Sequence, residues 1–150
     1  MTKQSPIDRV WNVVDKVGVC MMTTRFSDGL RARPLEARAD RNENVIWFLS
    51  DRRASKDDEI KAYPTICLTF IDPKEKVYLS ISGNASMSRD TESAKRLWNS
   101  EQVISFRPER AEIWDGPASS ALAGYEFAKA RATGQKPNLG EKRKSTVRMD

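Results

Sequence analysis

Residues 31–56 contain two arginines and a serine–lysine pair, which are residue types that bind an anion. Arg31 and Arg33 are two residues apart in an extended stretch, so their side chains should leave the same face of a strand. Ser55 occupies an N-cap position, and Lys56 is the first residue of an expected short helix. Guanidinium, hydroxyl and ammonium groups and the N–H groups of a helix start all donate hydrogen bonds to phosphate oxygens. The pattern therefore predicts a phosphate site, and the alternative is a pair of solvated arginines on an antiparallel hairpin.

The residue inventory argues against triad and metal chemistry. The chain contains no histidine, which removes the commonest general base and metal ligand. Cys20 and Cys67 both lie in apolar strand-like stretches, where we expect them to be reduced, buried and inert. The sequence has neither a Walker nor a Rossmann glycine pattern. We therefore expect no metal site and assign no catalytic residue.

The composition is that of one small, basic domain. The 150 residues fit a single domain, and 39% apolar against 31% charged residues imply a core that is compact or shared with another subunit. Lys and Arg outnumber Asp and Glu by 26 to 21, and the resulting charge of +5 suits nucleic acid or a small polyanion.

Nucleic acid and membranes are the less favoured partners. The basic cluster near the C-terminus lacks interleaved aromatic residues, which indicates a solvated face; its members are Lys142, Arg143, Lys144 and Arg148. No stretch approaches the ~20 apolar residues of a membrane span, and the N-terminus lacks the apolar part of a signal peptide. We therefore expect a cytoplasmic protein that does not contact a membrane.

Hydrophobic periodicity predicts a mainly β domain with flanking helices. Ser5 and Pro6 begin a first helix, whose apolar residues through Val17 share one face. Six short strands are expected at Val19–Thr24, Leu30–Arg38, Val45–Leu49, Thr65–Ile71, Lys76–Ser82 and Ala85–Asp90, the first three as a meander and the last two separated by a bulge or turn at Gly83–Asn84. Further helices are expected from Lys56, from Thr91 and from Ser119 or Ser120 through Arg131. Strand segments at Val103–Phe106 and Ala111–Trp114, interrupted at Arg107–Pro108, and a short closing strand at Thr146–Met149 complete the pattern. Such close strand spacing predicts a small antiparallel barrel, forming one domain over residues 1–150 with a polar tail from residue 133.

Several motifs, in this order, resemble those of one protein family. Arg31-Ala32-Arg33-Pro34-Leu35 is similar to an Arg-x-Arg-Pro-Met/Leu signature, and Val45 to Ser50 followed by Ser55-Lys56 is similar to a flavin and phosphate segment. Ser82 to Ala85 resembles a strand crossing, and Pro108 to Pro117 resembles a Pro-x-x-Ala-Glu-x-Trp-Asp motif. The chain thus resembles the pyridoxamine 5′-phosphate oxidase-related family of FMN-binding split β-barrels, in the branch related to general stress protein 26.

The resemblance implies a six-stranded antiparallel split β-barrel that forms a homodimer, with FMN in clefts at the subunit interface. Arg31, Arg33, Ser55 and Lys56 would hold the FMN phosphate, with Pro34 and Leu35 completing the signature. The backbone of Trp47, Phe48, Leu49 and Ser50 would line the edge of the isoalloxazine ring. Trp98 and Trp114 would cover the ring from the partner subunit, or else serve as ordinary core or interface aromatics.

Two departures from the family limit what the resemblance implies. The segment between Trp98 and Pro108 is shorter than in relatives, and the chain lacks the Trp…Arg-x-His ending that holds substrate in the vitamin B6 oxidase. We therefore expect an FMN-dependent redox enzyme for an unknown small molecule, rather than a vitamin B6 oxidase. The alternatives are a flavin-binding stress or sensor protein without efficient turnover, and a deazaflavin-dependent reductase. Haem is disfavoured because the histidine ligand is missing.

Overall fold

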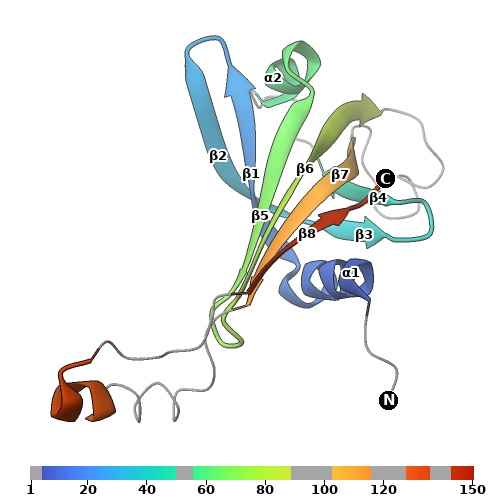
Figure 1. Ribbon diagram of the computed structural model, residues 1–150. Helices are drawn as coiled ribbons and strands as arrows, with labels where there is room; N and C mark the ends of the chain where they lie inside the picture. The colour runs from blue at the N-terminus through green and yellow to red at the C-terminus, as the bar shows by residue number, and fades with distance from the viewer. Residues whose placement is uncertain (1–4, 50–55, 89–102, 116–127, 136–142) are drawn as a thin grey trace.

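The computed structural model describes residues 5–49, 56–88, 103–115, 128–135 and 143–150 (Figure 1). Two helices and eight strands have these bounds: α1 Pro6–Val17, β1 Val19–Phe26, β2 Gly29–Glu36, β3 Arg38–Asp40, β4 Val45–Leu49, α2 Lys56–Ala62, β5 Thr65–Asp72, β6 Val77–Ser88, β7 Val103–Asp115 and β8 Arg143–Arg148. Residues 128–133 are also helical. No helix in the described ranges is long and apolar enough to cross a membrane.

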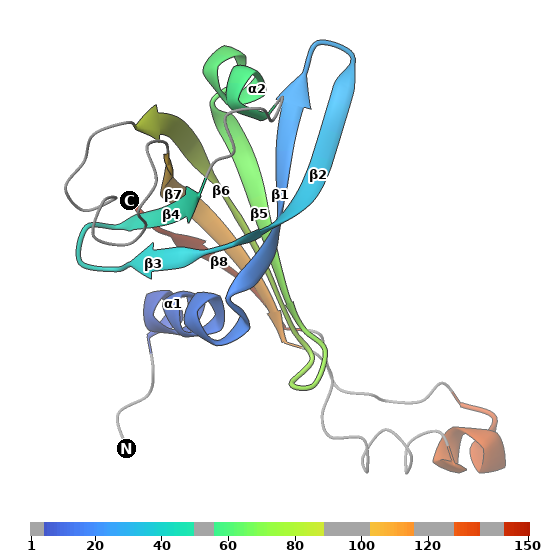
Figure 2. The ribbon, with the colours of Figure 1, turned by 180° about the vertical axis from the view of Figure 1, so that it is seen from behind.

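One curled antiparallel sheet forms the body of the molecule. Its strand order is β2-β1-β5-β6-β7-β4-β3. Strand β8 pairs with β7 along the same edge as β4, but with the later residues of β7. The two ends of this order, β2 and β3, are consecutive in the chain and are separated only by Ala37. The sheet therefore curls until its ends meet at Ala37, where the strand leaves β1 and joins β4 (Figures 1 and 2). This arrangement confirms the expected antiparallel split barrel with few helices, although the described sheet has eight strands where six were expected.

Helix α1 begins and ends at the predicted residues. The Ser5 side chain accepts a hydrogen bond from the Asp8 backbone N–H at 3.2 Å, and Pro6 opens the first turn. Gly18 ends the helix with a φ of 76°, a conformation that glycine adopts without steric cost. The apolar face is buried against the sheet through Val10, Trp11 and Val14. Trp11 is therefore a core residue.

The core is formed largely by apolar side chains that alternate along the strands and point inward. The inward residues of β5 and β6 are buried as predicted: Ile66, Leu68 and Phe70, with Val77, Leu79 and Ile81. Strand β4 is buried on both faces, because Ile46 and Phe48 join the main core while Trp47 packs in a second cluster with Val45 and Val103. Each such side chain contributes about 1.5–3 kcal/mol through burial.

Two predicted breaks in the strands are wrong. The expected fifth and sixth strands are one strand, β6, and the bulge expected at Gly83 appears as a register shift between Ser82 and Gly83. Strand β7 likewise runs through Arg107 and Pro108 without interruption. Pro108 lies opposite Gly83 at the bulge, where the hydrogen-bond ladder is already irregular, so the missing proline N–H is tolerated.

The predicted Leu30–Arg38 strand and three-strand meander are also wrong. Ala37 separates β2 from β3, and its N–H donates to the Gly18 carbonyl at 2.7 Å. Strand β4 pairs with β3 and β7, and not with β2, in the described sheet. The closing strand is confirmed as β8, with an earlier start at Arg143. The helix predicted from Thr91 lies outside the described residues, as does most of the helix predicted through Arg131.

The two cysteines are free but differ in environment. Cys20 is buried on the inward face of β1, and burial, with a smaller contribution from Cys67, raises the pKa of its thiol to about 12. The predicted burial of Cys67 is wrong, because this residue alternates with Ile66 and Leu68 and lies half-buried on the other face, 3.3 Å from the Ser80 hydroxyl. Cys20 is thus a protonated core residue, which agrees with the inert role expected for it.

Candidate functional site

Arg31 and Arg33 extend from β2 toward the short helix α2. Arg31 Nη1 lies 3.5 Å from Glu59 Oε1, and Arg33 Nη2 lies 3.0 Å from Glu59 Oε2. Both arginines therefore leave the same face of β2, as their spacing predicts. Figures 1 and 2 show α2 at the end of the sheet where β1 and β2 also lie.

Glu59 and Thr24 complete this cluster, and the sequence pattern does not single out either of them. The Thr24 hydroxyl donates to Glu59 Oε2 at 2.6 Å, and the two residues are 0% and 7% exposed. In the sequence, Glu59 resembles one more acid in the exposed first turns of a helix. The available signal is Thr24, a polar residue that strand alternation places on the same inward face as Cys20 and Met22.

The cluster keeps positive charge and a free donor. Two guanidinium groups face one carboxylate, which leaves a charge of +1 among these groups. Arg31 is 48% exposed, whereas Arg33 is only 19% exposed. Arg33 Nε is buried and has no hydrogen-bond partner among the described residues. A buried donor without a partner is costly, so this edge of the guanidinium suits an acceptor oxygen supplied by a ligand.

Strand β4 presents its backbone beside the split. Strand β3 begins at Arg38, opposite Trp47, so within the described sheet no β3 residue pairs with Phe48 or Leu49. The Phe48 side chain is fully buried in the core and Leu49 is half exposed, so Phe48 has only its backbone to offer a ligand. The Trp47 indole Nε1 is buried without a partner in the described part of the chain.

The other predicted site residues are placed differently. Leu35 shares the inward face of β2 and packs against the core, whereas Pro34 lies opposite Met21 on the outward face and is exposed. Lys56 begins α2 as predicted, but its side chain lies outside the described part of the structure. Ser50, Ser55 and Trp98 also lie outside the described residues.

Trp114 is remote from the arginines within one chain. Arg33 is aligned across the sheet with Ala111 of β7, through Met22, Leu68 and Ile81. Trp114 lies three residues beyond Ala111, and β1, β5 and β6 separate its strand from β2. Lys144 Nζ lies 5.7 Å from the centre of its ring. A single chain therefore does not bring Trp114 to the predicted phosphate site.

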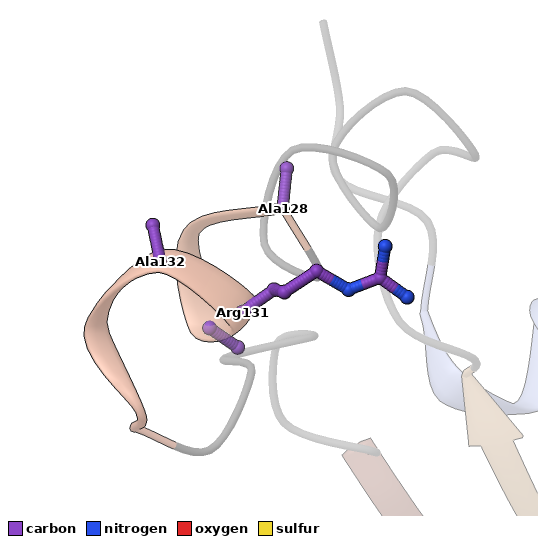
Figure 3. A pocket seen from close by; sticks show the side chains of 4 residues that line it. Ala128, Arg131 and Ala132 are labelled. Carbon is purple, nitrogen blue, oxygen red and sulfur yellow. The ribbon is translucent and has the colours of Figure 1, made fainter.

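A separate cavity lies beside residues 128–132. It has a volume of about 740 Å³, and its described lining residues are Ala128, Ala130, Arg131 and Ala132 (Figure 3). These belong to the helical segment 128–133, which Figure 1 shows set apart from the sheet. The described part of the lining, three methyl groups and one guanidinium, forms no catalytic arrangement. In the described ranges there is also no group of three or more His, Cys, Asp or Glu residues that could hold a metal ion.

Solved structures share this fold. A candidate general stress protein 26 from Jannaschia sp. CCS1 is 23% identical, with a TM-score of 0.62 over 93% of this chain and 95% of that one. A pyridoxamine 5′-phosphate oxidase-related, FMN binding protein from Nostoc punctiforme PCC 73102 is 11% identical, with a TM-score of 0.62 over 97% of each chain. A protein related to general stress protein 26 of B. subtilis, from Clostridium acetobutylicum, is 14% identical, with a TM-score of 0.61 over 76% of this chain and 91% of that one. At these identities the likeness is one of fold.

The family is established by the sequence as a whole. Comparison with curated proteins finds no match. Residues 5–138 match the family model described as "Pyridoxamine 5'-phosphate oxidase like", which agrees with the motifs and with the curled antiparallel sheet. The chain therefore belongs to the pyridoxamine 5′-phosphate oxidase-like family.

Proposed function

We propose that this protein binds FMN and acts as a redox enzyme on a small molecule other than a vitamin B6 compound. The observation that carries the proposal is Arg33, whose buried Nε has no partner in the described structure while Nη2 binds Glu59. A phosphate oxygen would satisfy that donor, and Arg31 beside it adds a second positive charge. The family match and the FMN-binding relative from Nostoc support the same ligand.

The described residues fit FMN at both ends of the molecule. Arg31 and Arg33, beside α2, would hold the phosphate. The free backbone side of Phe48 and Leu49, across the split from β2, would meet the ring. A bound flavin would supply transfer of a hydride or of single electrons. The sequence has no dinucleotide glycine pattern, which favours FMN over FAD.

Titration of the apo-protein with FMN and FAD, followed by flavin fluorescence, tests the ligand. We expect FMN to bind more tightly than FAD, because the donors are arranged for one terminal phosphate. Tighter binding of FAD, or binding of neither flavin, would overturn the proposal. The absorption spectrum of the purified protein distinguishes FMN from a deazaflavin, which presents a similar phosphate and tricyclic ring.

The second candidate is a flavin-binding stress or sensor protein without efficient turnover. It is favoured by the cluster itself, where the only carboxylate among the described groups, Glu59, is engaged by both arginines and Thr24. Two of the similar structures are also named for general stress protein 26. Rates of flavin reduction and reoxidation with candidate electron donors and acceptors separate the two functions.

We also propose that the protein acts as a homodimer with the flavin between subunits. The outward face of the sheet carries large apolar side chains, with Val19 53%, Ile71 50% and Tyr78 38% exposed. Ile71 lies opposite Tyr78, which lies opposite Trp114, so these three form a row across β5, β6 and β7. An exposed row of this kind, rich in aromatics, is typical of an interface. A two-fold partner would also supply the Trp114 that one chain keeps away from its own arginines.

Light scattering tests the dimer. We expect about twice the chain mass of 17.0 kDa, with flavin released as dilution separates the subunits. Ile71→Lys should shift the protein toward monomer, because it places a charge in the apolar row. Leu30→Lys is the matched control, since Leu30 is 71% exposed at the β1–β2 turn and lies outside the row. A monomer that keeps its flavin at nanomolar protein would contradict the proposal.

A further inference from the structure

Glu59 is the centre of a buried polar network built from three elements. Its Oε1 faces Arg31 at 3.5 Å, and its Oε2 accepts hydrogen bonds from Arg33 at 3.0 Å and from Thr24 at 2.6 Å. Thr24 and Arg31 are themselves opposite each other in the β1–β2 ladder. One carboxylate from α2 therefore ties together the neighbouring side chains of two strands.

The network leaves one donor of Arg33 without a partner among the described residues. Glu59 engages Nη2 of Arg33, while the neighbouring Nε of the same guanidinium is buried without a partner among the described residues. Glu59 itself is 7% exposed and Thr24 is 0% exposed, so the carboxylate sits beneath the arginines and away from solvent. Arg31 at 48% and Arg33 at 19% are both more exposed than this carboxylate, so a ligand from solvent meets the arginines before Glu59.

We infer that Glu59 is a positioning residue, which holds the guanidinium groups of Arg31 and Arg33 side by side so that their two charges and the unpartnered Arg33 Nε–H can receive a phosphate group. This inference rests on the proposed FMN function. Two like charges repel one another, and long arginine side chains lose rotamer freedom when they are fixed. The buried carboxylate offsets both costs before the ligand arrives. The Thr24 hydroxyl orients the carboxylate in turn.

If Glu59 competed with the ligand instead of positioning the arginines, its removal would change anion affinity in the opposite direction. If Glu59 only competed with the ligand for the arginines, its removal would free them and add one positive charge to the site, so an anion would bind more tightly. If Glu59 positions the arginines, its removal weakens anion binding despite the added charge. The direction of the change therefore decides between the two roles.

The experiment compares FMN and riboflavin binding in Glu59→Gln, which removes the charge and keeps the shape of the side chain. We expect FMN affinity to fall about tenfold, the lower end of the loss known for outer-shell partners of metal ligands, while riboflavin affinity stays the same. Thr24→Val should also lower FMN affinity, by a smaller factor. This variant replaces Glu59→Gln in the test if Glu59→Gln does not fold.

The matched control is Glu36→Gln. Glu36 lies on β2, the strand of Arg31 and Arg33, and it also pairs with an arginine, Arg38, but both side chains are exposed. Glu36→Gln removes one negative charge from the surface, as Glu59→Gln removes one from the cluster. It should leave the affinities for FMN and riboflavin unchanged. Unchanged or tighter FMN binding in Glu59→Gln would overturn the inference. So would an equal loss of FMN and riboflavin, because it would mean that Glu59 supports only the fold.

A measurement without flavin separates this inference from the proposed function. The Arg33 Nε–H group should give a sharp NMR signal in the wild-type protein, since its guanidinium is held and buried, and a broadened one in Glu59→Gln. If the wild type binds neither flavin, the FMN proposal fails, and this signal still tests positioning. An Arg33 signal that is the same in both proteins would overturn the positioning role.

Discussion

Replacement of Arg33 by alanine is expected to weaken FMN binding by about 1.5–3 kcal/mol, or about 10- to 150-fold, while riboflavin binding changes little. The change removes a mostly buried guanidinium whose Nε has no partner in the described structure. Riboflavin lacks the phosphate, so the difference between the two ligands isolates the anion site. Titration of both ligands into the same variant measures that difference.

Two further variants sharpen this result. Arg33→Lys keeps the charge but loses the planar fork of donors, so we expect it to recover only part of the affinity. Arg38→Ala removes an exposed arginine of β3 that pairs with Glu36 on the surface, and it should bind FMN like the wild type. An equal loss for FMN and riboflavin in Arg33→Ala would show that Arg33 supports the fold and does not hold a phosphate.

Replacement of Gly83 by alanine is expected to destabilise the protein by about 3 kcal/mol or more. An added Cβ would lie 2.2 Å from the Arg107 carbonyl oxygen and 2.9 Å from Phe106 Cζ. The carbonyl belongs to the backbone of β7, so relief of the overlap requires β6 and β7 to separate at the centre of the sheet. Thermal unfolding should show a melting temperature lower by about 6–12 °C, the shift expected for that loss in a chain of this size.

Gly29→Ala provides the control for this change. A Cβ at Gly29 would have Phe26 Cζ as its nearest neighbour, at 3.5 Å, which is an ordinary van der Waals contact. We expect its melting temperature to stay close to that of the wild type, within about 0.5 kcal/mol of stability. Equal stability of the two variants would contradict the close approach of β6 and β7 at Gly83.

Local patterns in the sequence determined a large part of this protein. Ser5, Pro6 and Gly18 set the bounds of α1, because capping and backbone conformation depend on neighbouring residues alone. Alternation placed the apolar residues of β5 and β6 in the core, and it placed Arg31 and Arg33 on one face of β2. These features repeat with the period of the backbone, so they can be predicted without knowledge of the fold.

Strand partners, in contrast, were decided by the tertiary structure. Local propensity predicts breaks at Gly83 and Pro108, but the two residues lie opposite each other, and one bulge accommodates both within long strands. Ala37 divides an apparently continuous strand, because the Gly18 carbonyl binds its N–H and the chain passes from β1 to β4. The residues next to Gly83 and Ala37 in the sequence therefore do not predict these pairings.

The candidate site shows the same division. Its arginines were predicted from their spacing, whereas Glu59 and Thr24 were not, since they are 35 residues apart and meet only because α2 packs on β1. A polar residue on a helix is indistinguishable from a solvated one until the surface against which it packs is known. The sequence therefore determined which groups could bind an anion, and the tertiary structure decided which buried carboxylate holds them, because burial and long-range contact arise only when the elements are assembled.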